Sequence, residues 1–283
     1  MMDAGKKADV VVEESKVKKK MKIDIKELKP KVAVLKIEDT QLYFVNSLRR
    51  IMLSELPKLA VDNVVIYDNT SALFDEIISH RLGLIPIPTD LSLLTFKENC
   101  VCKGKGCPNC TVRYTLSKEG EGTIYSGDLQ ASEKSWKITE DKIPIVRLYG
   151  DQRLILELEA VLGRGKDHAK WQSVLAPAFR MDVTIEFDKS KTEDVKNIIN
   201  KLPEGIADIK NDKIILKNET MLPALESVIE KEKINFISVT RDPTKITFSF
   251  ETDGSLTAKD AIVESANILE QKYKEFAKQL KAL

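Results

Sequence analysis

Four cysteines are the residues of this sequence best suited to chemistry, because all of them lie within one short segment. They follow the spacing C-x-C-x4-C-x2-C, and the residues between them include two glycines and a proline that favour tight turns. Four thiolates brought together in this way are typical of a structural, tetrahedral zinc site, which leaves no position open for a substrate. We therefore expect a structural Zn²⁺ bound by Cys100, Cys102, Cys107 and Cys110.

Two other states of the cysteines stay open at this point. They could hold an iron–sulfur cluster, or they could be free or oxidised in pairs. Crowding in a single loop favours metal binding over a framework of disulfides, and reduced thiols are typical of the cytoplasm. We therefore expect a cytoplasmic protein.

Other candidates for catalysis are few. The sequence contains two histidines, His80 and His168, and no cysteine obviously pairs with either for nucleophilic attack. A carboxylate cluster that would hold catalytic Mg²⁺ is not evident. Residues 163–166 lack the spacing of a phosphate-binding loop and predict a tight turn, which presents Lys166, His168 and Trp171. We expect no catalytic residue in this chain.

Composition bounds the class of protein. The 283 residues include 45 Lys plus Arg and 44 Asp plus Glu. A chain so close to neutral lacks the basic excess of a dedicated nucleic-acid binder, so we expect contact with DNA to be indirect. No stretch approaches the roughly 20 apolar residues of a membrane span, and we expect no contact with a membrane. The lysine-rich residues 1–20 predict a disordered basic tail.

The elements around the cysteine loop belong to a chain long enough for two or three compact units. Alternating apolar residues between 22 and 37 predict two strands. Asp39 or Thr40 then caps a helix that ends at Pro57. Residues 59–180 combine strand-like runs, a short helix and the cysteine loop at 100–110, and they predict an inserted, mostly β domain.

The order of elements changes between residues 181 and 237. Alternation over residues 181–187 predicts a strand, and Ser190 with Glu193 predicts a capping box for the helix that follows. Strand, helix and strand come next, an order that suggests a ferredoxin-like inserted domain. This insert contains no cysteine, which excludes an iron–sulfur cluster within it. Residues 241–244 predict a turn that ends the insert.

The last predicted helix, at about residues 258–283, has one continuous apolar seam. Its apolar residues recur at intervals of four, three, four, three and four, which is a heptad-like pattern. The seam consists of Ile262, Ala266, Leu269, Tyr273, Phe276 and Leu280. Such a face packs either on the chain's own sheet or on a partner, and the periodicity alone does not distinguish the two.

Several long segments closely resemble the alpha-like subunits of cellular RNA polymerases. They are FVNSLRRIMLSELP at 44–57, NTS at 69–71, DEIISHRLGLIPI at 75–87, GRGKDHAKWQ at 163–172 and FETDGSL at 250–256. The four-cysteine loop and the insert are similar to the archaeal D subunit in particular. Many D subunits carry cysteines and an iron–sulfur cluster in that insert, and this chain departs from them there.

The resemblance implies an α+β fold and a role in assembly without catalysis. An alpha-subunit-like dimerisation domain is built from both chain ends, residues 21–58 plus 238–283, and the mostly β and ferredoxin-like domains are inserted between them. The dimerisation domain pairs with a small alpha-like subunit, L, and the heterodimer docks the large catalytic subunits and small platform subunits.

A set of residues is expected at these partner interfaces, from the apolar seam, the basic helix flank and the resembling segments. They are Leu48, Arg49, Arg50, His80, Arg81, Leu82, Gly83, Lys166, His168, Trp171, Ile262, Ala266, Leu269, Tyr273, Phe276 and Leu280.

Two other hypotheses explain parts of the pattern. The cysteine loop and the basic tail together suit an independent nucleic-acid-binding protein with a zinc loop, although the near-neutral charge argues against it. An independent enzyme would need the segment from Gly163 to Trp171 as its active loop. Only the polymerase interpretation accounts for the whole chain from Met21 onward.

Overall fold

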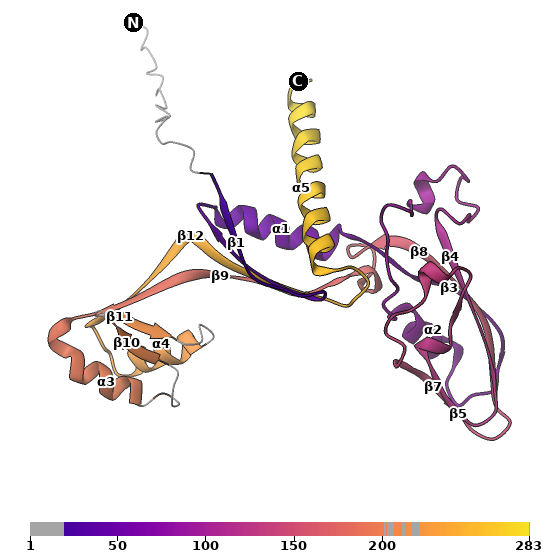
Figure 1. Cartoon of the computed structure of the whole chain (residues 1–283), viewed down its shortest axis with the longest axis horizontal. Helices are drawn as coiled ribbons and strands as arrows, with labels where there is room; N and C mark the ends of the chain where they lie inside the picture. Colours follow the sequence, from indigo (N-terminus) through magenta and orange to yellow (C-terminus); the bar gives the residue numbers. More distant parts are fainter. Residues whose placement is uncertain (1–19, 201, 203–206, 211–212, 217–220, 283) are drawn as a thin grey trace, which may run out of the picture.

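The computed structural model describes residues 20–200, 202, 207–210, 213–216 and 221–282, so the predicted tail lies outside the described residues except for Lys20. The chain is elongated, and three units lie one after another along its long axis (Figure 1). Each unit has its own cluster of buried apolar side chains. The fold is a mixture of sheets and a few helices, mostly sheet, which confirms the expected α+β class at this level.

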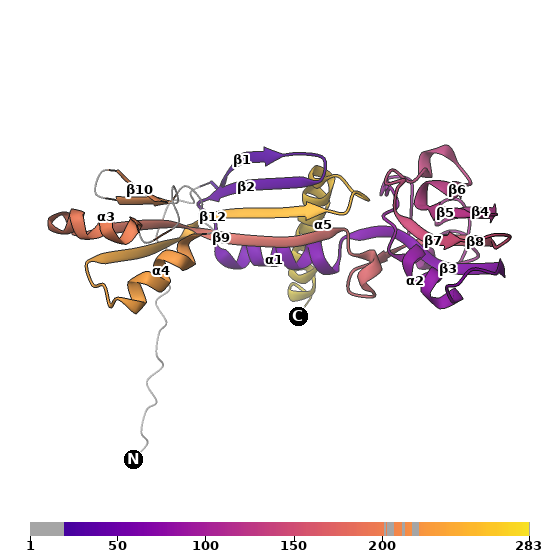
Figure 2. The same ribbon diagram turned by 90° about the horizontal axis from the view of Figure 1, so that it is seen from below.

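The central unit combines segments from both ends of the described chain. Strands β1 (Lys22–Leu28), β2 (Val32–Glu38), β12 (Ile237–Thr252) and β9 (Val174–Phe187) lie side by side, all antiparallel, and Figure 2 shows them in this order. Helices α1 (Leu42–Ser54) and α5 (Ala258–Leu280) pack on one face of this sheet.

The core of the central unit follows from strand pairing. Leu35 lies opposite Phe248 and Ile37 opposite Ile246, and directly paired residues share a face of the sheet. All four side chains are buried and belong to the same cluster as Val45, Leu48 and Met52 of α1 and Ala258 and Ala261 of α5.

Helix α1 begins differently from the prediction. Its N-cap is Gln41, which makes no side-chain capping bond, so the predicted cap at Asp39 or Thr40 was wrong. Thr40 is buried, and its backbone N–H donates to the Thr244 carbonyl at 3.3 Å. Thr40 is therefore bound to the insert side of β12, and the helix starts after it.

The second unit is a four-stranded antiparallel sheet with a smaller strand pair beside it. The sheet has the order β3 (Pro57–Asn69), β8 (Arg153–Arg164), β4 (Thr111–Glu119), β6 (Gln130–Ala131), and the pair is β5 (Gly122–Tyr125) with β7 (Pro144–Leu148). Helix α2 (Asp75–Gly83) buries Ile78 and Leu82 in the same core. Short 3₁₀ turns connect these elements at Lys97–Asn99, Ser126–Asp128, Lys134–Trp136 and Ala169–Trp171.

The third unit has the element order β9, α3 (Thr192–Asn200), β10 (Ala207–Lys210), β11 (Lys213–Leu216), α4 (Leu222–Lys231), β12. The strand order is β12-β9-β11-β10, so sequence reasoning missed β10, a strand of only four residues. The capping box was also wrong: the Asp188 side chain accepts from Ser190 N–H in a 3₁₀ turn at Lys189–Lys191, and α3 begins only after that turn.

Strands β9 and β12 run through both the central and the third unit, so one six-stranded sheet connects them. The turn predicted at residues 241–244 was wrong, because the chain continues there as β12. Asp242 pairs with Asp182 and Ile246 with Met181, so three residues of β12 are extra and form a bulge. Pro243 has no N–H to donate, and the bulge keeps it out of the ladder of hydrogen bonds between the strands.

Two groups of ion pairs join the second unit to the central one. Lys58 of β3 is only 3% exposed, and its Nζ lies 2.5 Å from Oδ2 of Asp253, just after β12. At the end of α1, the Glu55 carboxylate accepts from Lys166 at 3.3 Å and from Lys272 of α5 at 3.0 Å. These contacts join three segments that are distant in sequence.

Candidate docking surface and metal centre

The four cysteines come together as their spacing predicts. Their Sγ atoms all lie within 4.8 Å of one another. Cys100 and Cys107 are 3.4 Å apart, Cys102 and Cys110 are 3.6 Å apart, and Cys107 and Cys110 are 3.9 Å apart. A tetrahedral ion with metal–sulfur bonds of about 2.3 Å places its ligands about 3.8 Å from one another. The cysteines form no disulfide, and the donor set fits a single metal ion.

The loop backbone holds the sulfurs in place. Gly104 and Gly106 have φ of 81° and 83°, a region that favours glycine. The Cys107 N–H points at the Cys110 sulfur at 3.4 Å, and the Cys110 N–H donates to the Cys107 carbonyl at 2.9 Å. The Thr95 N–H donates to the Asn109 carbonyl at 2.8 Å, which fastens the loop to the segment before it.

Proton sharing among the sulfurs also suits metal binding. Burial works to raise the pKa of Cys102, but hydrogen bonds from the Cys100 and Cys110 thiols outweigh it and lower the pKa to about 6. The pKa of Cys107 is raised to about 12, mainly by its hydrogen bond to Cys100. Without an ion, one thiolate is therefore stabilised by its protonated neighbours, and a metal would replace those protons.

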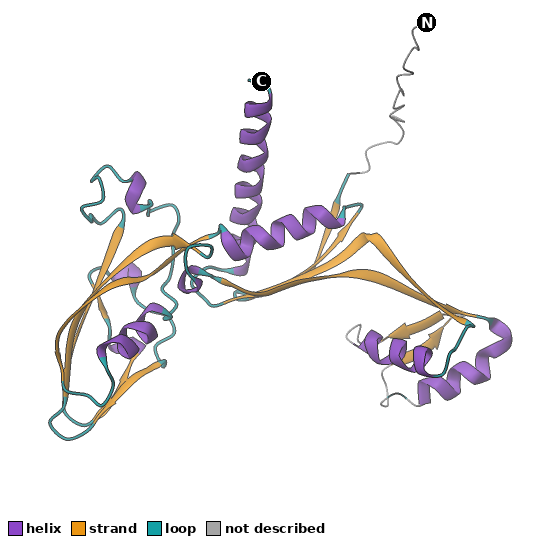
Figure 3. Cartoon of the chain, turned by 180° about the vertical axis from the view of Figure 1, so that it is seen from behind, coloured by secondary structure: helices purple, strands orange, loops and turns teal. Residues whose placement is uncertain are grey.

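The apolar seam of α5 divides into two parts. Of the predicted seam residues in its first half, Leu269 is buried, Ile262 is half-buried and Ala266 is exposed. The residues of α5 that are buried besides Leu269 are Ala258, Ala261 and Ser265, which lie beside the predicted seam. From Glu270 onward every described residue of the helix is exposed, and α5 stands away from the sheet in Figures 1 and 3. Tyr273 is 55% exposed, Phe276 59% and Leu280 53%. The first half of α5 thus packs on the central unit, whereas the large apolar side chains of its second half stay exposed among the described residues.

An apolar groove lies between α5 and the start of α1. Its volume is 440 Å³, and it is lined by Phe44, Ala266, Leu269, Glu270, Tyr273, Lys274 and Ala277. The groove is mostly apolar. It extends from the exposed half of the seam at Tyr273 to the buried Leu269. Ile262, which is half-buried, packs against the central core and does not line the groove.

Further exposed apolar residues lie on β1 and were not among the predicted interface residues. Ile23 and Ile25 are both 57% exposed. They lie opposite Ile37 and Leu35, which are buried on the helix-covered face, so they extend that face past the helices. Their alternation was visible in the sequence, but their exposure follows from the place of β1 at the edge of the sheet.

The residues predicted around α1 differ in their accessibility. Leu48 is buried in the central core, so its side chain supports the surface from within. Arg49 is half-buried, and its Nε donates to Asn46 at 3.2 Å on the same helix. Arg50 is exposed. Of these three, Arg50 is the most accessible to another polypeptide.

The segment from Gly163 to Trp171 clasps the end of α1. A Cβ on Gly165 would lie 2.1 Å from the Leu53 carbonyl oxygen, and the Lys166 N–H donates to the Ser54 carbonyl at 3.0 Å. A Cβ on Gly163 would overlap the Trp171 ring, whose Nε1 donates to the Val161 carbonyl. The two glycines are therefore required for close packing, and no phosphate needs to be invoked.

The charged side chains of this segment remain accessible in part. Lys166 is exposed and pairs with Glu55, and His168 is exposed with its Nδ1 accepting from the Lys170 N–H at 3.0 Å. His80 of α2 lines the same concavity as His168, which has a volume of 540 Å³. The tertiary structure therefore brings together the two histidines that are 88 positions apart in sequence.

Helix α2 presents an apolar stripe that sequence reasoning did not single out. Leu82 and Gly83 are buried, and Arg81 donates to the Ile145 carbonyl at 2.7 Å, so these predicted residues anchor the helix. Phe74 is 78% exposed and Leu84 64% exposed. Their spacing with Ile77 and Arg81 is helical, and this pattern is the signal that could have identified them.

Sequence similarity to RNA polymerase subunits shows to which family this chain belongs. An Rpo3 subunit of DNA-directed RNA polymerase from Picrophilus torridus is 32% identical over 271 residues, which cover 91% of this chain and 99% of the relative. The Rpo3 subunits of Methanosphaera stadtmanae and Methanosarcina mazei are 36% and 37% identical over 89% and 90% of this chain, and 96% of each relative is covered. The chain belongs to the Rpo3 family of DNA-directed RNA polymerase subunits.

A second match falls on part of the chain. Residues 64–188 match the family described as the RNA polymerase Rpb3/RpoA insert domain. This range holds most of the second unit, including the cysteine loop, and ends just after β9. Together with the Rpo3 relatives, it confirms the expected membership of the archaeal alpha-like subunits.

Two further findings concern possible metal groups and membrane spans in this Rpo3 chain. In the described part of this chain, the four cysteines form the only group of three or more Cys, His, Asp or Glu residues close enough to share a metal ion. No described helix is both long and apolar enough to cross a membrane.

Proposed function

We propose that this chain is a non-catalytic platform subunit of a DNA-directed RNA polymerase, acting in the cytoplasm. In this role it forms a heterodimer with the small alpha-like subunit L, and the heterodimer docks the large catalytic subunits and the small platform subunits. Contact with DNA is indirect, through the complex. Membership of the Rpo3 family supports the assignment to the polymerase.

One observation carries the heterodimer proposal, the exposed half of the α5 seam. Tyr273, Phe276 and Leu280 project from a helix that has left its own sheet, beside the apolar groove against α1. Large apolar side chains grouped in this way on a soluble surface mark an interaction site. A related subunit with its own helices of this type would complete the core, and Ile23 and Ile25 would extend the contact.

The large subunits would bind elsewhere, at α2 and the clasp after β8. His80, His168 and the exposed stripe from Phe74 to Leu84 form an accessible surface on the second unit. We propose this surface as the site that docks a large subunit. Arg50 at the flank of α1 can form a bidentate ion pair with a partner carboxylate, which a lysine could not copy.

The domain division that we propose follows these roles. Residues 21–58 with 238–283 form the dimerisation domain, 59–180 the inserted mostly β domain, and 181–237 a ferredoxin-like domain. Support for the last comes from its β-α-β-β-α-β order and from its separate buried core.

We also propose that the cysteine loop holds a structural Zn²⁺. Four thiolates in a short loop suit this ion, and the four ligands leave no site for a substrate. The ion would add to the hydrogen bonds that hold the loop, among them those from the Thr95 N–H and hydroxyl to the Asn109 carbonyl. The third unit, which lacks cysteines, would be stabilised by its apolar core alone.

Coexpression tests the heterodimer. The full-length chain, produced with its cognate small alpha-like subunit, should purify as a one-to-one complex by size-exclusion chromatography with light scattering. Tyr273→Asp should weaken this complex strongly, whereas Gln271→Asp on the opposite side of α5 should leave it intact. A stable, monodisperse monomer that ignores the small subunit would contradict the proposal.

The same preparation distinguishes the platform role from the alternative function, independent binding of nucleic acid. An independent nucleic-acid-binding protein would bind DNA or RNA as an isolated chain, with affinity that falls steeply as salt rises. The platform role predicts weak binding of this kind, and it predicts that the large subunits copurify with the heterodimer. Strong binding of the isolated chain, without copurifying subunits, would favour the alternative.

A further inference from the structure

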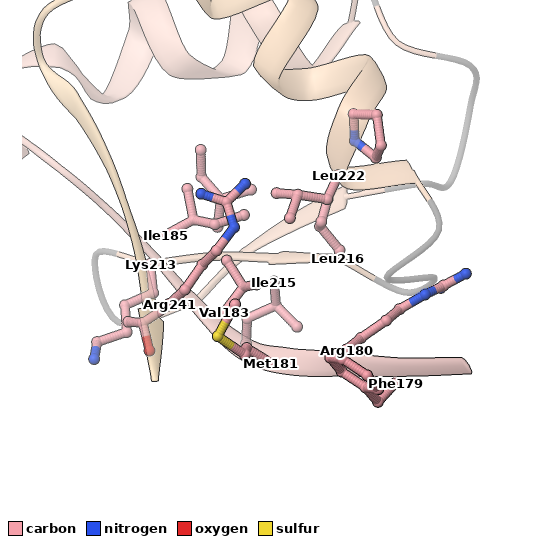
Figure 4. A pocket seen from close by; sticks show the side chains of 13 residues that line it. Phe179, Arg180, Met181, Val183, Ile185, Lys213, Ile215, Leu216, Leu222 and Arg241 are labelled. Atoms are coloured by element: carbon pink, nitrogen blue, oxygen red, sulfur yellow. The ribbon is translucent and has the colours of Figure 1, made fainter. Parts of the chain in front are cut away.

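The third unit contains a cavity that neither the heterodimer nor the metal centre uses. Its volume is 560 Å³, and it lies between β9, β11 and the start of α4. Its wall is mostly apolar, with Phe179, Met181, Val183, Ile185, Ile214, Leu216 and Leu222 among the lining residues (Figure 4). Strand β11 and helix α4, which line the cavity, belong to the unit that lies farthest from the second unit, whereas its residues Phe179 to Met181 lie where β9 leaves the central unit (Figure 1).

The cavity lies along β9 where this strand passes from the central unit into the third unit. Phe179, Val183 and Ile185 of β9 lie opposite Phe248, Arg241 and Val239 of β12. They share one face with Met181, because side chains alternate along a strand. Phe179 packs against the central core, and Val183 and Ile185 against the third core, whereas Met181 belongs to neither.

The solvent side of the cavity is open. Ile215, Arg241, Lys213 and Pro223 line it and are all exposed. A small apolar molecule prefers an enclosed cavity that covers most of its surface. An open apolar hollow on a sheet surface instead suits one or two large side chains that belong to a longer polypeptide.

The charged residues that line the hollow, among those that the structure describes, are basic. Arg180, Lys213 and Arg241 line it, and no acidic residue is among the described lining residues. Figure 4 shows Arg180 and Lys213 pointing to opposite sides of the apolar cluster, with Arg241 beside it. Arg241 pairs with Glu226 and Lys213 with Glu186, in both cases through exposed side chains. The ion pairs of the described residues leave Arg180 without a carboxylate.

This charge pattern favours an acidic partner segment over a basic one. Exposed ion pairs contribute little stability, so a partner carboxylate can share Arg241 or Lys213 at small cost. Arg180 can pair with a carboxylate of the partner without breaking an ion pair to another described residue of this chain. The three lining cations and the two carboxylates paired with them leave a net positive charge at the hollow, which disfavours a basic segment.

We propose that this hollow is a docking site for an acidic amphipathic segment of another protein. One or two large apolar side chains of that segment pack on Met181 and Val183, and its carboxylates pair with Arg180 and Arg241. The third unit is then a recruiting module, and this role is separate from heterodimer formation through α5.

Peptide binding to the full-length chain tests this assignment. The probe is a short synthetic helical peptide with Leu and Phe on one face and Glu and Asp on the other. Methyl NMR should show shifts at Met181, Val183 and Ile185 when the peptide is added. A matched peptide with Lys in place of the acidic residues should bind at least about tenfold more weakly, because like charges oppose it.

Two variants and one control localise the binding. Arg180→Glu should weaken the acidic peptide about tenfold and lower the salt dependence of its affinity. Met181→Ser should weaken it through loss of apolar contact. Lys196→Glu, an equal charge reversal on exposed α3 outside the hollow, should leave binding unchanged. Because Arg180 is exposed, its variant is expected to fold, which unchanged methyl spectra of the other units would verify.

Four results would overturn the assignment. They are no binding of the acidic peptide, equal binding of the basic peptide, shifts confined to α5, and shifts at Met181 with a small apolar carboxylate such as decanoate but with neither peptide. None of these results affects whether the chain forms its one-to-one complex with the small alpha-like subunit, so the two proposals fail independently.

Discussion

The buried ion pair between Lys58 and Asp253 should hold the second unit against the central one. Lys58 is 3% exposed and the Asp253 side chain 16% exposed. The Asp253 Oδ1 also accepts from the Ser255 N–H at 2.9 Å and from its hydroxyl at 2.6 Å. Both carboxylate oxygens are therefore used, and the pair joins the start of β3 to the end of β12.

Lys58→Met removes the cation and keeps an apolar stem of similar length. Breaking a buried ion pair by removing one partner costs roughly 3–5 kcal/mol. Asp253 retains its two bonds from Ser255 and some contact with solvent, so we expect about 2–4 kcal/mol for this variant. Asp253→Asn should cost more than Lys58→Met, because it leaves the more deeply buried charge without its partner.

The double variant Lys58→Met with Asp253→Asn separates this explanation from simple loss of packing. Asn keeps an acceptor for Ser255, and no unpaired charge remains, so stability should return to within about 1 kcal/mol of the original. Urea unfolding followed by tryptophan fluorescence measures the free energy of unfolding of the two single variants and the double variant. Trp171 is a suitable probe because it packs on Gly163, the residue that pairs with Lys58.

An exposed ion pair supplies the control. Lys118 lies 2.8 Å from Asp128, with half of its side chain exposed, so Lys118→Met should cost less than about 1 kcal/mol. If the two single changes at the buried pair simply add in the double variant, or if Lys58→Met costs no more than Lys118→Met, the reasoning is refuted.

The remaining predictions concern the metal loop, the end of α1 and the clasp. Protein purified without added metal should contain about one zinc per chain by elemental analysis, and Cys110→Ser should lose it; folded, metal-free protein would contradict the site. Burial works to raise the pKa of Glu55, but its two lysine partners outweigh this and hold the pKa below its ordinary 4.5. The stability that ionised Glu55 provides is complete above pH 4.5 and is lost as pH falls through the lowered value, so the difference between the original chain and Glu55→Gln should shrink in acid. A difference in unfolding free energy that stays constant from pH 7 to pH 3 would argue against the network. Gly165→Ala places a Cβ against the Leu53 carbonyl and should cost about 1–3 kcal/mol, measured by thermal unfolding, whereas Gly122→Ala, with open space around it and no positive φ, should cost less than about 1 kcal/mol.

Part of the fold was predictable because it depends on local order. The periodicities of α1 and α5 and the alternation of β1 and β2 identified elements that the structure contains, and the cysteine spacing predicted that the four thiols lie close together. Errors occurred where a longer-range contact overrode a local signal. Thr40 is bound by Thr244 instead of capping α1, and the turn signal at Pro243 became a bulge within β12.

The accessibility of the candidate site was not predictable in the same way. The α5 seam reads as one stripe of six residues in the sequence, yet the structure buries Leu269 and exposes Tyr273. The division falls where the sheet ends beneath the helix, and the edge of a sheet is set by strands that lie far away in the chain. The same reason explains why Ile23 and Ile25 were recognised as strand residues but not as surface.

The sequence by itself determined the family, the cluster of four cysteines and the helices α1 and α5. These properties depend on residue type and on short spacing, which any folded or unfolded chain carries. Only the tertiary structure decided which apolar side chains remain exposed, that Lys58 and Asp253 meet, and that Met181 lies between two cores. These depend on contacts between segments up to about 200 residues apart, such as Lys58 with Asp253, and burial is a property of the assembled layers and not of the local sequence.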